Sequence, residues 1–172
     1  MKIDSATVRF LVLVFGISCS VALSAQPKPV NNPVVYDTFE ALEPILNRQT
    51  DTIYVINFWA TWCAPCVAEL PLFEQLSQQI QGKKVKILLV SIDFKRDLET
   101  KLKPFLAKRT FLTPVVSLTD SRQQLWINKV DPNWSGAIPA TLIYRNQDRK
   151  FVEGEFTSFE ALESTVNELG GQ

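Results

Sequence analysis

The chain has 172 residues, with 18 lysine and arginine residues balanced by 18 aspartate and glutamate residues, and it contains no histidine. Its hydrophobic content of 46% and charged content of 21% are ordinary for a globular protein. Zero net charge argues against nucleic acid as the main partner, because binding phosphates needs a surplus of cations. The missing histidine excludes Ser-His-Asp and Cys-His hydrolases, and every zinc or haem site that uses imidazole.

The first 25 residues are typical of an export signal. Two basic residues precede or flank an apolar run of 14 residues, Phe10–Leu23, and small residues follow at positions 24 and 25. Two alternatives stay open: a retained transmembrane anchor, which the shortness of the run disfavours, and a lipoprotein lipidated at Cys19. We therefore predict a periplasmic or cell-envelope location, with a cleaved signal peptide over 1–25.

Removal of residues 1–25 leaves 147 residues, enough for one compact domain, and two cysteines, Cys63 and Cys66. Exported proteins usually use disulfides as staples across long loops. Here the only possible intrachain bridge closes a four-residue turn, which restrains the unfolded chain far less than a long loop would. A disulfide that stabilises so little is expected to react.

Hydrophobic periodicity predicts the elements of a single domain over 35–172, after a proline-containing linker over 26–34. Helices are expected at 38–46, 63–81, 97–108, 121–129 and 158–169, and strands at 53–59, 85–92, 114–118, 141–145 and 150–156. Thr38, Asp97 and Ser158 are the expected helix caps, and Pro104 should kink or restart its helix. Alternating helices and strands that end in a hairpin predict an α/β fold with one central mixed sheet flanked by helices.

The candidate chemistry lies in the cysteine pair. Zinc needs about four ligands, and the expected mature chain has no histidine or further cysteine to complete a set with Cys63 and Cys66, so no metal is expected. The pair follows a buried strand and opens a helix, where unpaired backbone N–H groups and the positive end of the helix dipole favour a thiolate. We therefore expect Cys63 to be the attacking, more exposed sulfur and Cys66 to be the resolving sulfur of a disulfide couple.

Residues 55–71, VINFWATWCAPCVAELP, resemble the thioredoxin superfamily, and most closely the exported TlpA/ResA-like reductases. The resemblance extends from about residue 34 to 169 and implies a thioredoxin-like fold. Ile138 and Pro139 match the family's cis-proline loop, which implies that they face the disulfide and bind a substrate peptide. The segment 97–118 matches a helix–strand insertion before that loop. Trp62, beside the cysteines, is expected to form part of a docking surface.

Two positions depart from cytosolic thioredoxins. Asn57 stands where those proteins carry a buried aspartate, so it cannot accept a proton. Glu69 instead resembles an acidic residue that ResA-like proteins place near the active site, three positions after Cys66 and on nearly the same helical face. If partly buried, Glu69 would have a raised pKa and could carry the proton of the resolving thiol. The alternative is a solvated glutamate on the helix surface.

The leading hypothesis is an exported thiol–disulfide oxidoreductase that uses no cofactor and reduces other envelope proteins. The resemblance implies disulfide-bearing substrates such as apocytochrome c and a membrane thiol carrier as electron donor; we expect a monomer. Alternatives are a disulfide oxidant or isomerase, a non-catalytic binding module with a structural disulfide, and a peroxide reductase. The last of these needs a peroxidatic cysteine in another setting, with an arginine partner. A copper chaperone is disfavoured because the only methionine is Met1.

Overall fold

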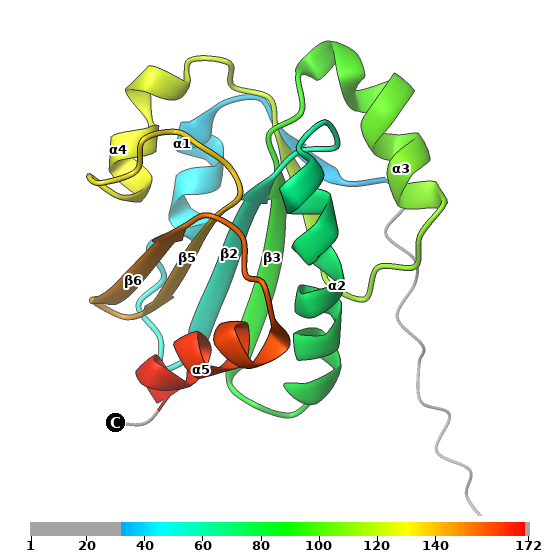
Figure 1. Cartoon of the computed structure of the whole chain (residues 1–172). Helices are drawn as coiled ribbons and strands as arrows, with labels where there is room; N and C mark the ends of the chain where they lie inside the picture. The colour runs from blue at the N-terminus through cyan, green and yellow to red at the C-terminus, as the bar shows by residue number, and fades with distance from the viewer. Residues whose placement is uncertain (1–31, 171–172) are drawn as a thin grey trace, which may run out of the picture.

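A computed structural model describes residues 32–170; the expected export signal and Cys19 lie outside these described residues. Six strands among them form one sheet in the order β1-β4-β3-β2-β5-β6 (Figure 1). The strands are β1 (Val34–Tyr36), β2 (Ile53–Trp59), β3 (Val85–Ser91), β4 (Val115–Leu118), β5 (Ala140–Arg145) and β6 (Asp148–Glu153). The α-helices are α1 (Phe39–Leu42), α2 (Ala64–Gln79), α3 (Lys103–Ala107), α4 (Ile127–Val130) and α5 (Phe159–Gly170). The predicted α/β class and mixed sheet are confirmed.

Strand β2 is the centre of the sheet, and all seven of its residues are buried, as its run of β-branched and aromatic side chains predicts. It pairs in parallel with β3 and antiparallel with β5. The register places Asn57 directly opposite Thr141, so these two side chains lie on the same face of the sheet. Figure 1 shows α2 and α5 side by side against the sheet, and the two helices are in contact.

The opposite face of β2 packs against α1 and α4 through aromatic rings. Phe58 lies 4.9 Å from Trp134 and 6.4 Å from Trp126, measured between ring centroids, and Trp126 stacks on Phe39 at 5.3 Å. Trp126 and Trp134 are both buried. Their role is therefore packing.

Strand β1 was not foreseen. It begins at Val34, the last residue of the expected linker, and pairs in parallel with β4. The helix expected from Thr38 is also shorter than predicted: α1 ends at Leu42 and a 3₁₀ turn follows over Glu43–Ile45. Thr38 makes no side-chain cap; the Phe39 N–H is instead donated to the Asp120 carboxylate at 3.1 Å. The cap is thus supplied from a distant part of the chain.

The segment between β3 and β4 is an irregular helical insertion. A 3₁₀ turn over Lys95–Asp97 leads into a π-helical stretch over Leu98–Leu102, and α3 then restarts at the position predicted for Pro104. Asp97 makes no cap hydrogen bond, contrary to expectation, and pairs with Lys101 at 3.2 Å. The cap predicted for the last helix is confirmed, since the Ala161 N–H is donated to Ser158 Oγ at 3.2 Å. Within residues 32–170, none of the helices has the length and apolar character needed to cross a bilayer.

Candidate active site

The cysteine pair lies at the carboxyl end of the central strand, where β2 turns into α2. Cys63 occupies the N-cap position of α2 and is joined to Cys66 by a disulfide. The backbone N–H of Cys66 is donated to Cys63 Sγ at 3.3 Å. The first turn of the helix therefore already directs a donor at this sulfur, and the same donor would stabilise a Cys63 thiolate after reduction.

The two sulfur-bearing residues differ in exposure. Cys63 keeps 6% of its surface exposed, whereas Cys66 has none. Cys63 is the more accessible of the two, which agrees with the expected order of attack. Its neighbours nevertheless cover most of it, so a partner disulfide has to fit closely against the surrounding surface to reach the sulfur.

The loop before β5 lies against the disulfide. The Ile138–Pro139 peptide bond is cis, as predicted. The Ile138 carbonyl oxygen is 3.6 Å from Cys63 Sγ, and the Pro139 carbonyl accepts the Gly154 N–H at 2.9 Å. One carbonyl of the loop therefore faces the reactive sulfur, while the next is held by the turn after β6.

Glu69 is buried on the inner face of α2, with only 2% of its surface exposed. The alternative of a solvated surface glutamate is therefore wrong. Oε2 of Glu69 accepts the Phe156 N–H at 2.8 Å, and Oε1 accepts from Asn57 Nδ2 at 2.8 Å. Burial raises the pKa of Glu69 to about 7, and the two hydrogen bonds oppose this rise because they favour the carboxylate. The group can therefore take or release a proton near neutral pH.

Asn57 connects Glu69 to the central strands. Its Nδ2 also donates to Thr141 Oγ1 at 3.1 Å, so both amide hydrogens are used. Its Oδ1 is buried and has no hydrogen-bond partner among the described residues. An asparagine here supplies donors to the carboxylate, which the aspartate of cytosolic thioredoxins could not do while both groups are ionised. Thr141 and the Phe156 amide were not identified from the sequence, because their proximity to Glu69 depends on the sheet register.

Solvent reaches Glu69 through a hollow of about 280 Å³. The hollow is lined by Pro65, Ala68, Leu72 and Phe156 as well as by Glu69 itself. Pro65 and Ala68 are in the first turns of α2, one residue before and two residues after Cys66. A proton can therefore pass between Glu69 and water without crossing the packed core.

Trp62 is 52% exposed beside Cys63 and has an aromatic neighbour that the sequence did not reveal. Phe94, 48% exposed, stacks with Trp62 at a centroid distance of 6.4 Å and an interplanar angle of 19°. The two residues follow the ends of adjacent strands, β2 and β3, which explains how they meet. This exposed pair provides an apolar surface next to the reactive sulfur.

The backbone before the cysteines is anchored by Asp93. This buried carboxylate accepts the Thr61 N–H at 3.0 Å and the Thr61 hydroxyl at 2.5 Å, and Ser91 Oγ donates to it at 2.8 Å. Asp93 therefore fixes the segment that leads to Cys63. Within the described part of the chain, no group of three or more acidic or cysteine side chains is placed to hold a metal ion.

The AhpC/TSA family model matches residues 42–149, which include β2, the cysteine pair, the insertion and the cis-proline loop. The chain belongs to the AhpC/TSA family. This is consistent with the resemblance to the thioredoxin superfamily, because the same sheet and helices carry the motif.

Individual relatives support the family assignment over shorter stretches. The chain is 49% identical over 39 residues to the thiol-disulfide oxidoreductase ResA of Oceanobacillus iheyensis, which is 23% of this chain and 20% of that protein. It is 40% identical over 45 residues to a thioredoxin of Rickettsia conorii, 26% of this chain and 42% of that protein. The matches thus span less than half of either relative.

The fold is shared more widely than the sequence. The crystal structure of a thioredoxin-related protein from Neisseria meningitidis serogroup B superimposes with a TM-score of 0.60 at 21% identity, covering 72% of this chain and 88% of that one. The thioredoxin-like fold predicted from the motif is therefore confirmed. For this AhpC/TSA family member, the structure brings together the predicted residues Trp62, Cys63, Cys66, Glu69 and the 138–139 loop.

Proposed function

We propose that the protein is a thiol–disulfide oxidoreductase in which Cys63 and Cys66 alternate between dithiol and disulfide. The observation that carries the proposal is the position of Cys63 at the N-cap of α2, where it receives the Cys66 N–H. A structural bridge between residues three apart would add little stability. A buried proton acceptor next to the pair has no purpose in a merely structural disulfide.

The proposed reaction is a two-electron exchange. The Cys63 thiolate attacks one sulfur of a substrate disulfide, forming a mixed disulfide and releasing a substrate thiolate. Cys66 then loses its proton and attacks Cys63 Sγ, so that the Cys63–Cys66 disulfide forms and the second substrate thiolate leaves. The substrate has gained two electrons, and each substrate thiolate takes a proton from water or from a nearby acid. A dithiol donor restores the reduced pair by the reverse exchange.

Glu69 is proposed to accept the proton of Cys66. Cys66 is fully buried, so its thiol cannot transfer a proton directly to bulk water. Glu69 lies one helical turn further along α2, has a pKa of about 7 and borders a hollow open to solvent. Asn57 acts as a positioning residue, because its amide holds Oε1 of Glu69 and favours the charged form.

We further propose that the protein is exported and acts as a reductase of disulfide-bearing envelope proteins, as a monomer supplied by a membrane thiol carrier. The support is the signal-like pattern of residues 1–25 and the ResA-like motif around the cysteines. The direction is tested by the reduction potential. Similar sites range from about −270 to −120 mV, and a value above about −150 mV would identify an oxidant instead.

Peroxide reduction, the alternative that the family name raises, has less support from the geometry. No arginine among the described residues donates a hydrogen bond to Cys63, whose sulfur instead contacts backbone groups of Cys66 and Ile138. A peroxide-consumption assay with a thiol reductant would distinguish the two activities.

The decisive experiment is to trap the mixed disulfide. A Cys66→Ser variant, incubated with an oxidised disulfide peptide, should accumulate a covalent adduct through Cys63, visible by non-reducing electrophoresis and mass spectrometry. The Cys63→Ser variant is the matched control and should form none. A wild-type protein that neither reduces insulin nor exchanges with a disulfide peptide would support the non-catalytic binding module.

A further inference from the structure

The insertion between β3 and β4 carries an excess of positive charge in a chain with zero net charge. Residues 95–109 contain six cationic and two acidic side chains, a net charge of +4. This cluster lies in the insertion that ends in α3, at the edge of the active-site helix α2 (Figure 1). An excess of one sign in a single segment produces a local field that the net charge does not reveal.

The basic side chains border a hollow of about 350 Å³ that reaches the active-site loop. Three cations line it, Lys101, Lys108 and Arg109, and no carboxylate is among its lining residues. Thr61, two residues before Cys63, also lines it. A chain segment lying in this hollow would therefore extend to within a few residues of the reactive sulfur.

Half of the cations of the insertion are available to a partner. Lys95, Lys101 and Lys103 are paired with Asp37, Asp97 and Glu99, respectively. Lys108 and Arg109 form no ion pair with any residue that the structure describes. The Arg109 guanidinium lies over the ring of Phe105, 3.7 Å from its centroid, which fixes its direction without neutralising it.

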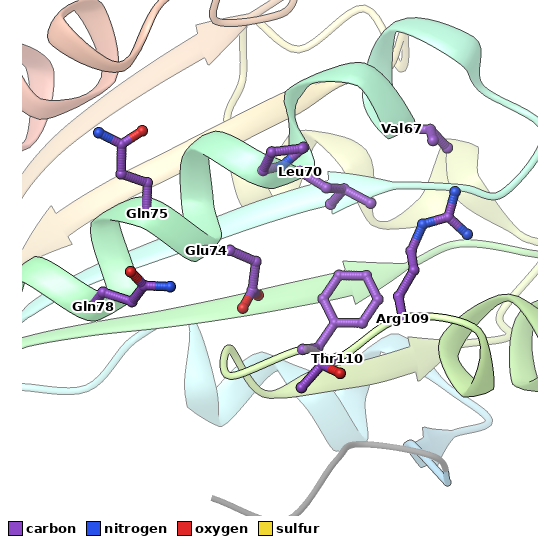
Figure 2. A pocket seen from close by; sticks show the side chains of 9 residues that line it. Val67, Leu70, Glu74, Gln75, Gln78, Arg109 and Thr110 are labelled. Atoms are coloured by element: carbon purple, nitrogen blue, oxygen red, sulfur yellow. The ribbon is translucent and has the colours of Figure 1, made fainter.

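A second hollow, of about 430 Å³, continues from Arg109 along α2 (Figure 2). Figure 2 shows Arg109 extending toward Val67, with Leu70 and then Glu74 further along the helix. The Glu74 carboxylate accepts the N–H groups of Leu112 and Thr113 at 2.7 and 3.2 Å, so it is engaged within the protein. Apolar side chains thus form part of one wall, and a free cation marks the end nearest the cysteines.

A fourth cation of the insertion, Arg96, lies beside the exposed aromatic pair. The Arg96 guanidinium is 4.9 Å from the centroid of the Phe94 ring, and Phe94 stacks in turn on Trp62. Two buried carboxylates, Asp93 and Asp120, line the hollow beside these rings. Asp93 accepts hydrogen bonds from Thr61 and Ser91, and Asp120 is paired with Arg122. Three of these four cations, Arg96, Lys108 and Arg109, therefore form no ion pair among the described residues.

We propose that this basic surface, defined by Arg96, Lys101, Lys108 and Arg109, binds an acidic segment adjacent to the disulfide of the substrate protein. The proposal rests on the proposed thiol–disulfide exchange and names its substrate class. The occupant follows from charge complementarity and from position, because only a chain that presents a disulfide to Cys63 has reason to lie in a hollow that begins at Thr61. A flat anionic membrane would contact the outer cations but would not enter the hollow.

The test compares three disulfide peptides that differ only in flanking residues, which are acidic, neutral or basic. At low ionic strength we expect wild-type protein to reduce the acidic peptide about 10-fold faster than the basic one, and the ratio to approach one at high salt. In a Lys108→Glu/Arg109→Glu variant the ratio should fall below one. The matched control is Lys83→Glu/Lys86→Glu, which has the same change in net charge at the opposite end of β3 and should retain the preference.

Each outcome has a distinct meaning. Reduction of the neutral peptide by wild-type protein tests only the proposed thiol–disulfide exchange. Its result does not depend on whether acidic peptides are preferred over basic ones. Equal rates for acidic and basic peptides in active wild-type protein would overturn the docking surface, as would loss of the preference in both double variants. Co-sedimentation with phosphatidylcholine vesicles, with and without phosphatidylglycerol, gives the other test: loss of anionic-vesicle binding in Lys108→Glu/Arg109→Glu with an unchanged peptide ratio would assign the surface to a membrane and reject the proposal.

Discussion

The two sides of the disulfide carry opposite kinds of charge. On the inner side of α2, Glu69 is a single buried carboxyl, held by Asn57 and the Phe156 amide. On the side of the insertion, Lys108 and Arg109 are exposed cations without ion-pair partners among the described residues. A buried group is shielded from salt but responds to pH, whereas exposed lysine and arginine respond to salt but keep their charge. The comparison assigns proton transfer to one side and encounter with substrate to the other.

The largest expected effect lies between the two sides, at the sulfur itself. Replacing Cys63 by serine removes the nucleophile and should lower the rate of disulfide reduction by at least about 10³-fold, whatever the pH or salt. Cys66→Ser should also stop turnover but leave the first attack intact. A single-turnover reaction with an oxidised peptide distinguishes the two variants, because only Cys66→Ser should form the adduct. Adduct formation by Cys63→Ser would show that the roles of the two sulfurs are reversed.

The second effect concerns stability on the inner side. The pKa of Glu69 is about 7 in the folded protein and about 4.5 in an unfolded chain, so the folded state binds the proton more tightly. The contribution of this protonated carboxyl to the free energy of unfolding is complete below pH 4.5. It is lost as the pH rises through 7, which lowers the free energy of unfolding by at most about 3 kcal/mol. Urea unfolding of wild type and Glu69→Gln across this window measures the difference. A wild-type stability that rises with pH relative to Glu69→Gln would contradict the raised pKa.

The third effect is kinetic. Without its carboxyl, Glu69→Gln should resolve the mixed disulfide about 10²-fold more slowly, and the pH dependence near 7 should disappear from that step. Asn57→Ala sharpens the test, because it removes a hydrogen-bond donor to the Glu69 carboxylate while leaving Glu69 in place. The inflection in the pH profile of the resolution rate should therefore move to higher pH. Stopped-flow measurement of the resolution step provides both readouts. An inflection that persists in Glu69→Gln would mean that another group titrates.

The smallest effect belongs to the insertion side. Raising the ionic strength should slow wild-type reduction of an acidic peptide up to about 10-fold, through the encounter and not through chemistry. In Glu69→Gln the same salt dependence should persist, because the buried side is shielded. Steady-state kcat/KM as a function of salt, at fixed pH, checks this separation. A salt effect that vanishes with Glu69 would show that the two sides are not independent.

Much of the fold follows from local patterns in the sequence. The β-branched and aromatic run 53–59, interrupted only by Asn57, identified the central strand, and the cysteine motif after it identified the start of the next helix. The features that were missed depend on distant partners. β1 has only three residues and is held by β4, and the cap of α1 comes from Asp120 and not from the adjacent Thr38. No local pattern contains that information.

The site shows the same division. The spacing of Cys63, Cys66 and Glu69 on one helix was sufficient to place them together. The burial of Glu69 could not be predicted from this spacing, because it depends on the Phe156 backbone and on Asn57 facing Thr141 across two strands. Phe94 was missed for a similar reason: it meets Trp62 only because β2 and β3 end side by side.

The insertion enters and leaves the sheet between two neighbouring parallel strands, β3 and β4. Its length is therefore not constrained by the pairing of β2, which leads to the cysteines, although Phe105 of the insertion packs on Trp59 of β2 at 5.4 Å. The exposed side chains of such a segment can vary separately from its buried ones: exchanging the exposed residues of 94–114 for those of another member of the fold should redirect the protein to different substrates while the redox couple stays as it is. Such chimaeras offer a route to reductases of chosen selectivity.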